Sequence, residues 1–346
     1  MPAPVTIDDA TIAAQSGTGA ATTTAPAQLS FCATAGRPSG CGIHTVTIPA
    51  GGDVYSDAAT FPDTTTGSGN LAVSIHLPTA ISTAPVHTAG NTTNYLASGD
   101  TTANQDGAPY TTSFTDGYFL TAVDVSTADP GQGTIVVLGD QTSAKGAPGG
   151  TYQSTWVDDL PAKLGANLPG SLVNASLAGS QTTAWWRAAE TGAAFNQSIL
   201  GEPNIRTVIV ALGAQDILQN VAPADTEQNL TALMKSITSA YCIKNFQRAD
   251  GSAIHIVLAT VPPLGLAPTD QRELNRQELN SAIRNNFVSM GADDIVDFDQ
   301  AVRDSANPNT LSPLYLTDGV PNATYYNTIA QTLTDAVETF PPTAQL

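Results

Sequence analysis

The chain has 346 residues, 41% of them hydrophobic, which is enough for one large domain or two smaller ones. Lys and Arg number 12 against 30 Asp and Glu, so the formal net charge is −18. A surface this acidic repels phosphate backbones and anionic lipid heads, so we expect neither a nucleic acid nor a membrane surface as partner. No segment approaches the roughly 20 consecutive apolar residues of a membrane span.

The cysteines bear on the compartment in which the protein works. Cys32 and Cys41 flank a turn-rich segment and predict a small disulfide loop, which forms in oxidising surroundings. Cys242 is predicted to pack as a small apolar side chain. The sequence contains no CxxC pair and no histidine-rich cluster, so we expect no metal site and no cofactor. No signal-peptide pattern opens the chain. The cysteine pair favours a secreted or extracellular protein whose leader is absent from this sequence, and a cytoplasmic protein is the alternative.

Residues 1–130 are predicted to form an antiparallel β-sandwich or jelly-roll domain. Short strand-like segments alternate with Gly, Pro, Asn and Asp, and helical periodicity is almost absent. Clear examples of these segments are residues 46–48, 71–77 and 118–125.

Residues 131–346 change to an alternation of strands and helices. Continuous apolar runs, typical of strands buried on both faces, occupy residues 134–138, 171–174, 208–212, 254–260 and 295–298. Helix-compatible segments lie near residues 152–164, 183–194, 225–240, 269–290 and 324–338. This order predicts an α/β domain with a flavodoxin-like, doubly wound sheet of five parallel strands. In such sheets the loops at the carboxyl ends of the strands carry the chemistry, so these loops hold the candidate site.

Four of these loops carry a distinctive set of residues. They are Gly139-Asp140-Gln141-Thr142-Ser143 after the first strand, residues 175–180 with Gly179 after the second, Gly213-Ala214-Gln215-Asp216 after the third, and Thr317-Asp318-Gly319-Val320-Pro321-Asn322 before the last helix. In order and setting, they resemble the four sequence blocks of the SGNH (GDSL) hydrolase family. The resemblance implies a site in which a Gly-Asp-Ser turn supplies the nucleophile, a Gly and an Asn complete the oxyanion hole, and a late Asp-x-x-His completes a triad.

The resemblance extends over most of the chain. Residues 146–160 resemble the helix that follows the nucleophile in that family, and residues 297–304 resemble the strand before its last block. The first half, notably residues 46–51 and 71–75, is similar to the β-sandwich that precedes the hydrolase domain in one bacterial subgroup.

The residues that would perform hydrolysis differ from the family pattern. Gln141 holds the nucleophile position, and a carboxamide has no ionisable oxygen with which to form an acyl-enzyme. Gln215 stands where the family has Asn, and the segment after Asp318 contains no histidine. Only Gly179 and Asp318 match the pattern in residue type. A hydrolase of this class needs a nucleophile, a base and oxyanion donors, and the first two are missing.

Other hydroxyls and histidines of the chain are weak candidates to replace the missing nucleophile and base. Thr142 and Ser143 are predicted to cap the next turn, and Ser180 is a further hydroxyl in the loop after the second strand. Of the four histidines, His44, His76 and His87 lie in the β half, and His255 lies near the start of a predicted strand, at the end opposite the functional loops.

The loop aspartates and the Trp pair each have two interpretations. Asp140 and Asp216 either hold their turns by accepting hydrogen bonds from loop amides or, together with Asp318, perform acid–base chemistry or bind a cation. Trp185 and Trp186 either pack in the core or line a pocket where a sugar or acyl group stacks. Adjacent residues of a helix point in different directions, so the two Trp side chains cannot both face inward.

Several functions therefore compete. The leading hypothesis is a GDSL-like pseudoenzyme, or otherwise repurposed protein, that keeps the cleft and binds a carbohydrate or acyl-ester ligand. A second hypothesis is an enzyme of changed mechanism, in which Asp318 or Asp216 acts as acid or base while Gln141 and Gln215 donate to an oxyanion. Such a site could run a hydrolysis by activated water, an acyl transfer or a cyclisation. A third hypothesis is a residual carboxylesterase that uses Ser143 or Ser180, and a fourth is a mainly structural role.

Overall fold

The structure is a computed structural model, and the chain divides into two compact units, Met1–Leu120 and Thr121–Leu346. It describes residues 3–338 except 18, 39, 61–69, 85, 88–92, 121–122, 124–132, 145–154, 166–167, 169, 192–204 and 239–253. The sequence predicts the boundary between residues 130 and 131, which is ten residues after the division between these two units. Residues 130 and 131 lie outside the described residues. Cys242 also lies outside them.

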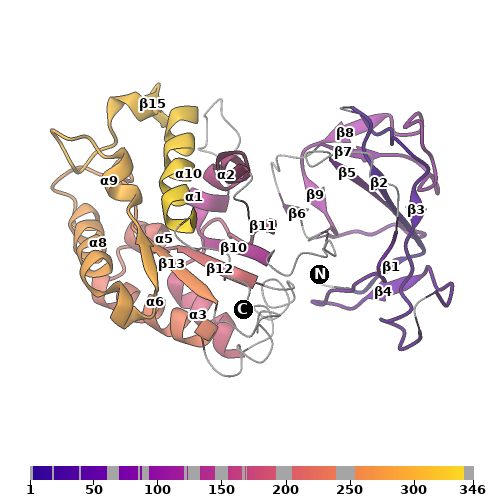
Figure 1. The fold of residues 1–346 in the computed structure, drawn as a ribbon, viewed down its shortest axis with the longest axis horizontal. Helices are drawn as coiled ribbons and strands as arrows, with labels where there is room; N and C mark the ends of the chain where they lie inside the picture. Colours follow the sequence, from indigo (N-terminus) through magenta and orange to yellow (C-terminus); the bar gives the residue numbers. More distant parts are fainter. Residues whose placement is uncertain are drawn as a thin grey trace, which may run out of the picture. The chain divides into compact units, whose positions relative to one another are not determined.

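The second unit contains the predicted sheet of five parallel strands, in the order β11-β10-β12-β13-β14 (Figure 1). The strands are β10 (Gly133–Gly139), β11 (Gly170–Asn174), β12 (Ile205–Ala211), β13 (His255–Ala259) and β14 (Asp294–Val296). The second strand in the chain lies on one side of the first and all later strands lie on the other. This is the predicted flavodoxin-like order, and it places the topological switch point at the carboxyl end of β10.

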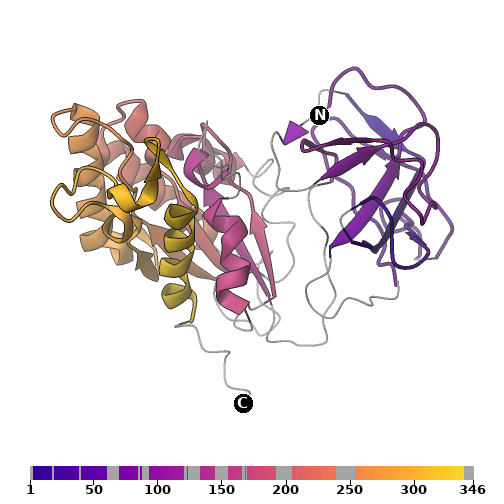
Figure 2. The ribbon, with the colours of Figure 1, turned by 90° about the horizontal axis from the view of Figure 1, so that it is seen from above.

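Helices cover both faces of this sheet (Figures 1 and 2). One face packs against α3 (Thr182–Thr191), α5 (Ala214–Leu218), α6 (Pro223–Thr238) and α8 (Gln271–Met290). The other packs against α2 (Trp156–Leu164), α9 (Phe298–Val302) and α10 (Ala323–Glu338). The remaining short elements are α1 (Gln141–Ala144), η2 (Pro313–Tyr315), β15 (Leu316–Thr317) and β16 (Val320–Pro321).

The apolar run of β10 explains why the sheet is buried between helix layers. Ile135 and Val137 belong to one core cluster, whereas Val136 and Leu138 belong to the other. Side chains alternate between the two faces of a strand, so a strand covered on both faces needs apolar residues at every position. The continuous run that predicted the strand is the direct result.

Local signals define the ends of the long helices. Thr155 and Asp158 form a capping box at the start of α2, in which Thr155 Oγ1 accepts from the Val157 and Asp158 N–H groups. Asp270 accepts from the Arg272 N–H at the start of α8, and Gly291, with φ of 105°, ends that helix.

The first unit consists of small antiparallel sheets, as the sequence predicts for this half. Its strands are β1 (Val5–Ile7), β2 (Asp9–Ala14), β3 (Ala27–Gln28), β4 (Val46–Ile48), β5 (Leu71–His76), β6 (Val86–His87), β7 (Asn94–Leu96), β8 (Thr112–Phe114) and β9 (Gly117–Tyr118). The strand predicted over residues 118–125 ends at Tyr118, because Phe119 has a left-handed backbone with φ of 65°. The predicted disulfide between Cys32 and Cys41 is confirmed. Among the described residues, no helix is long and apolar enough to cross a membrane.

Candidate functional site

Asp140, at the carboxyl end of β10, joins the first loop to the third. Its Oδ1 accepts from the backbone N–H of Thr142 at 3.1 Å and from the Thr142 hydroxyl at 2.9 Å. Its Oδ2 accepts from the backbone N–H groups of Ala214 at 2.8 Å and Gln215 at 3.3 Å. The carboxylate is fully buried, and this burial raises its pKa, although the hydrogen bonds oppose the rise. Asp140 therefore has the turn-holding geometry that was one of its two interpretations.

Gln141 begins α1 directly after this carboxylate, at the position where the family resemblance places the nucleophile. Both polar atoms of its carboxamide, Oε1 and Nε2, are buried and have no hydrogen-bond partner among the described residues. Buried polar groups in proteins are nearly always paired, so these two atoms need a partner in a water, a ligand or a residue outside the described ones.

The loop after β11 carries Gly179 and the hydroxyls of Ser176 and Ser180. Gly179 is exposed and has φ of 79°. Ser176 is buried, and its Oγ has no partner among the described residues. Ser180 Oγ donates to the Leu177 carbonyl at 2.7 Å and accepts from the Trp185 Nε1–H at 2.9 Å.

Asp216, in α5, reaches the start of α3. Its carboxylate accepts from the Thr182 backbone N–H at 3.0 Å and from the Thr182 hydroxyl at 2.7 Å. Burial raises its pKa, and the hydrogen bonds from Thr182 oppose the rise. This side chain therefore holds the helix that follows the second loop against the third loop.

The two Trp side chains separate, as the helical geometry of α3 requires. Trp185 is buried in the core cluster between the sheet and helices α3, α5, α6 and α8. Trp186 packs partly against the same cluster, with the Arg187 guanidinium 5.7 Å from the centre of its ring. The Trp186 Nε1 atom is buried and has no hydrogen-bond partner among the described residues.

The fourth loop forms a tight hairpin between β15 and β16. Thr317 pairs with Val320, so Asp318 and Gly319 are the only residues of the turn. Their φ angles are 52° and 78°, the left-handed backbone that a two-residue hairpin favours. Asp318 is exposed at the tip of this hairpin, whereas Asp140 and Asp216 are fully buried. Directly after β16, the Asn322 side chain accepts from the Tyr325 N–H in the first turn of α10.

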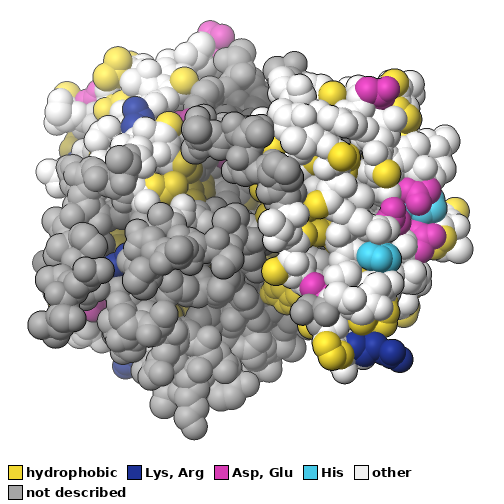
Figure 3. Space-filling view, turned by 45° about the vertical axis from the view of Figure 1, so that its right-hand side comes forward, with side chains coloured by type: hydrophobic (Ala, Val, Ile, Leu, Met, Phe, Trp, Pro, Cys, Tyr) yellow, Lys and Arg dark blue, Asp and Glu magenta, His cyan; other side chains and the backbone are white. Residues whose placement is uncertain are grey.

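The alternative serine and the histidines lie in other environments. Ser143 is fully buried, and its Oγ accepts from the Trp156 Nε1–H at 3.2 Å. His255 is the first residue of β13, at the amino end of the sheet. The other histidines belong to the first unit, where His76 contacts Asp8 at 2.6 Å and His44 contacts the Leu29 carbonyl at 2.7 Å. Figure 3 shows histidine side chains at the surface of that unit, one of them among acidic side chains.

A small cavity of about 10 Å³ lies at the carboxyl ends of β10, β12 and β13. Asp140, Thr142 and Ala214 line it, together with Thr260, Val261, Pro262 and Phe298, which the sequence did not single out. This volume is close to the smallest that can hold a water molecule. The only signal for these residues was their position at or after the ends of the predicted strands 254–260 and 295–298. No group of three or more His, Cys, Asp or Glu side chains in the described residues is arranged to hold a metal ion.

Several solved structures are similar to this chain at low identity. A GDSL-like lipase from Bacteroides thetaiotaomicron is 19% identical, covers 60% of this chain and 88% of its own, and has a TM-score of 0.41. A carbohydrate acetylesterase from Sinorhizobium meliloti is 14% identical, with coverage of 60% and 99% and a TM-score of 0.46. An aryl esterase from M. Smegmatis is 15% identical, with coverage of 60% and 100% and a TM-score of 0.46.

No curated protein matches the sequence. Residues 137–320, however, match the GDSL-like Lipase/Acylhydrolase family. This range begins within β10 and ends in the hairpin that carries Asp318, so it includes the first three loops and residues 317–320 of the fourth. It also covers more than half of the chain. The protein therefore belongs to the GDSL-like lipase/acylhydrolase family.

Proposed function

We propose that this protein is a non-hydrolytic member of its family, which binds a carbohydrate or acyl-ester ligand at the carboxyl edge of the parallel sheet. The observation that carries the proposal is Gln141 at the nucleophile position, with both carboxamide atoms buried and without partners in the described residues. A carboxamide cannot be deprotonated to attack an ester carbonyl, but it donates and accepts hydrogen bonds.

The sequence of the hairpin in the fourth loop also favours a protein without a catalytic base. Family enzymes need an imidazole near the nucleophile to take its proton. Here the chain passes from Val320 directly into Pro321, which ends β16, and then into Asn322, whose side chain contacts the first turn of α10. The only histidine of the second unit, His255, begins β13 at the other end of the sheet.

The serine hydroxyls nearby favour the same proposal. Ser143 Oγ accepts from Trp156, and Ser180 Oγ bonds to both Leu177 and Trp185. A serine nucleophile needs a base within about 2.6–3.2 Å of its oxygen, and these contacts are an indole N–H and a backbone carbonyl instead. Neither serine has the surroundings that activate a hydroxyl.

The ligand class follows from the groups that lack partners. The Gln141 carboxamide offers a donor and an acceptor, and the Trp186 Nε1–H offers a further donor. Hydroxyls and ester carbonyls complement such groups, and leaving a buried polar atom unpaired costs about 1–3 kcal/mol. A ligand that supplies these partners removes that cost.

Binding is tested by titration calorimetry of the full chain with acetylated oligosaccharides, such as acetylated xylobiose, and with their deacetylated counterparts. We expect saturable binding by the wild-type protein, weakened by Gln141→Ala and unchanged by Gln228→Ala, an exposed residue of α6. Turnover of p-nitrophenyl acetate is measured in parallel and should equal the rate in buffer. Wild-type hydrolysis above that rate, lost in Ser143→Ala or Ser180→Ala, would contradict the proposal in favour of a residual carboxylesterase.

A second candidate is an aspartate-dependent enzyme, favoured by the buried carboxylates of Asp140 and Asp216. Burial raises the pKa of both, and raised carboxyl pKa values are typical of acid–base catalysts. Against it, all four carboxylate oxygens of this pair accept hydrogen bonds from loop and helix groups. If turnover of any ester is found, its loss in Asp216→Asn or Asp318→Asn identifies this mechanism.

We also propose that the protein works in an oxidising compartment outside the cytoplasm. The disulfide between Cys32 and Cys41 supports this, because cytoplasmic reductants keep most thiols reduced. Mass spectrometry of the protein isolated from its native source, after alkylation without reduction, tests the proposal. Alkylated Cys32 and Cys41 would contradict it.

A further inference from the structure

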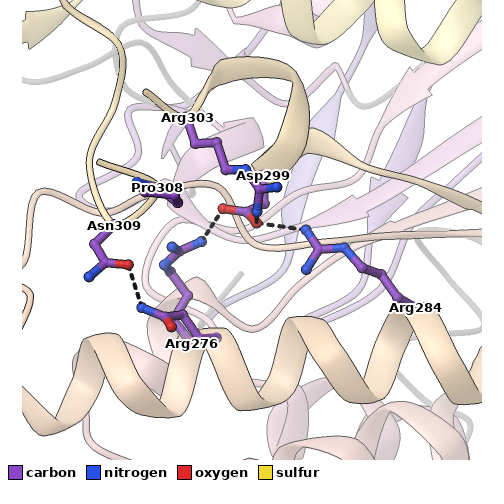
Figure 4. A pocket seen from close by; sticks show the side chains of 7 residues that line it. Arg276, Arg284, Asp299, Arg303, Pro308 and Asn309 are labelled. Atoms are coloured by element: carbon purple, nitrogen blue, oxygen red, sulfur yellow. Dashed lines mark hydrogen bonds and ion pairs between the residues drawn. The ribbon is translucent and has the colours of Figure 1, made fainter. Parts of the chain in front are cut away.

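We propose that a cavity beside helix α8 binds a tetrahedral oxyanion, such as a phosphate or sulfate group. The cavity has a volume of about 190 Å³ and lies between α8, α9 and the segment that follows α9 (Figure 4). Its lining residues are Arg276, Gln277, Arg284, Asp299, Arg303, Pro308 and Asn309. Three of the 12 Lys and Arg residues in this acidic chain therefore line one cavity.

The arginines meet at the carboxylate of Asp299. Asp299 Oδ1 accepts from Arg276 Nη1 at 2.6 Å, and Oδ2 accepts from Arg284 Nη2 at 2.6 Å and Arg303 Nη1 at 3.1 Å. The cavity wall therefore carries three guanidinium groups against one carboxylate. Two further carboxylates pair with this group, Glu273 with Arg276 and Asp297 with Arg284, but neither lines the cavity.

Arg276 provides a rigid floor for this site. Its side chain is 1% exposed, and two bonds to Glu273, at 2.8 and 2.7 Å, and one to the Val261 carbonyl, at 2.8 Å, fix its orientation. Its charge is matched by the carboxylates of Glu273 and Asp299, so Arg276 shapes the cavity while Arg284 and Arg303 supply the donors for an anion.

Several donors at the cavity remain available. Each guanidinium has five N–H groups. In the described part of the chain, the Arg303 side chain bonds only to Asp299, and Arg284 uses Nε and Nη2 but not Nη1. Asn309 Oδ1 accepts from Gln277 Nε2 at 2.6 Å, which leaves the Asn309 amide nitrogen as a further donor.

The placement of the donors favours a tetrahedral anion over a carboxylate. Arg284 comes from α8, Arg303 follows α9, and Asn309 lies on the segment across the cavity (Figure 4). A planar carboxylate is satisfied by one guanidinium fork, whereas the oxygens of phosphate or sulfate accept from several directions. The cavity has room for about six water molecules, so a small oxyanion fits with part of its hydration.

The proposal is tested by titration calorimetry of the full chain with sodium phosphate, sulfate, acetate and chloride at neutral pH and constant ionic strength. We expect saturable binding of phosphate and sulfate only. Arg303→Gln should weaken that binding by about tenfold or more, because it removes a charged donor group. Arg303→Lys, which keeps the charge, should weaken it less. Arg37→Gln is the control, because Arg37 is an exposed residue of the first unit.

Circular dichroism and the unfolding midpoint without added anion show whether each variant is folded. If Arg303→Gln is not folded, Arg284→Gln replaces it, and we expect the same loss of phosphate and sulfate affinity. Three results would overturn the proposal: no saturable binding of phosphate or sulfate, equal affinities of the wild type and a folded arginine variant, or acetate binding as strong as that of phosphate.

Discussion

The Asp140 carboxylate accepts a hydrogen bond from the backbone N–H of Ala214 at 2.8 Å, and the two residues are 74 positions apart in the sequence. Asp140 follows β10 and Ala214 begins α5, so one buried side chain fixes the distance between the loops of two neighbouring strands. The same carboxylate positions Gln141, which is the next residue, and the backbone of Gln215. The candidate site therefore depends on an aspartate that holds the loops in place.

Replacement of Asp140 by Asn should destabilise the fold by about 1–3 kcal/mol. Both oxygens of Asp140 accept hydrogen bonds from N–H groups, and Asn would turn an NH₂ group toward one of these donors. Urea unfolding followed by circular dichroism measures the change. Asp225→Asn, at an exposed position in the first turn of α6, is the control. Equal stabilities of Asp140→Asn and the wild type would refute this role of Asp140.

Gly139 should tolerate no side chain. A Cβ atom at this position would lie 2.6 Å from Ser143 Cβ, from Ser143 Oγ and from Ser176 Oγ. Overpacking of this kind costs about 1–3 kcal/mol, so we expect Gly139→Ala to unfold at lower urea concentration than the wild type. Gly19→Ala is the matched control, because a Cβ there has no neighbour within 4 Å. A neutral effect of Gly139→Ala would show that the loop has more room than the geometry gives it.

The stability contributed by Asp297 should depend on pH. Burial raises the pKa of Asp297, but hydrogen bonds, led by those from the Arg284 guanidinium, outweigh it and hold the pKa below the ordinary value of 3.8. A lowered pKa means that the carboxylate stabilises the folded state above pH 3.8 and that this contribution is lost as the pH falls through the folded-state pKa.

Asp297→Asn should therefore lower the free energy of unfolding by about 1.5–3 kcal/mol at neutral pH. The difference from the wild type should shrink progressively below pH 3.8, as Asp297 itself becomes protonated. Urea unfolding of both proteins across this pH range measures it. A difference that is constant with pH, or that grows in acid, is incompatible with the ion pair between Asp297 and Arg284.

The parallel sheet could be predicted because its central strands β10, β12 and β13 contain long apolar runs, a pattern that loops and surface strands do not show. The long helices were also predictable from their periodicity. The short helices α1, α5 and α9, of four or five residues, were missed because they are too short to show a helical period.

The site was predictable only as a set of loops. From the sequence we predicted that four residues lie at one sheet edge, namely Asp140, Gly179, Gln215 and Asp318. Their hydrogen-bond partners could not be predicted, because these depend on which chain segments meet in the fold. The contact between Asp216 and Thr182 has no local signal, since 34 positions separate them. The convergence of Arg276, Arg284 and Arg303 on Asp299 was equally invisible, because it depends on the packing of α8 against the segment that follows β14.

Gln141→Ser alone should not produce an esterase. The new hydroxyl would follow Asp140 but would have no imidazole to take its proton, since the hairpin of β15 and β16 contains none. Insertion of a histidine between Val320 and Pro321, combined with Gln141→Ser, supplies the missing base. We expect p-nitrophenyl acetate hydrolysis above background only in the combined variant, and substantial hydrolysis by Gln141→Ser alone would mean that another group serves as the base.

The most direct test of the central claim is the intact mass of the wild-type protein after incubation with a fluorophosphonate, which reacts covalently with activated serines. An unchanged mass is expected after an incubation that fully labels a serine esterase in the same tube. Addition of one phosphonyl group, mapped by peptide sequencing to a serine of the second unit, would contradict the account.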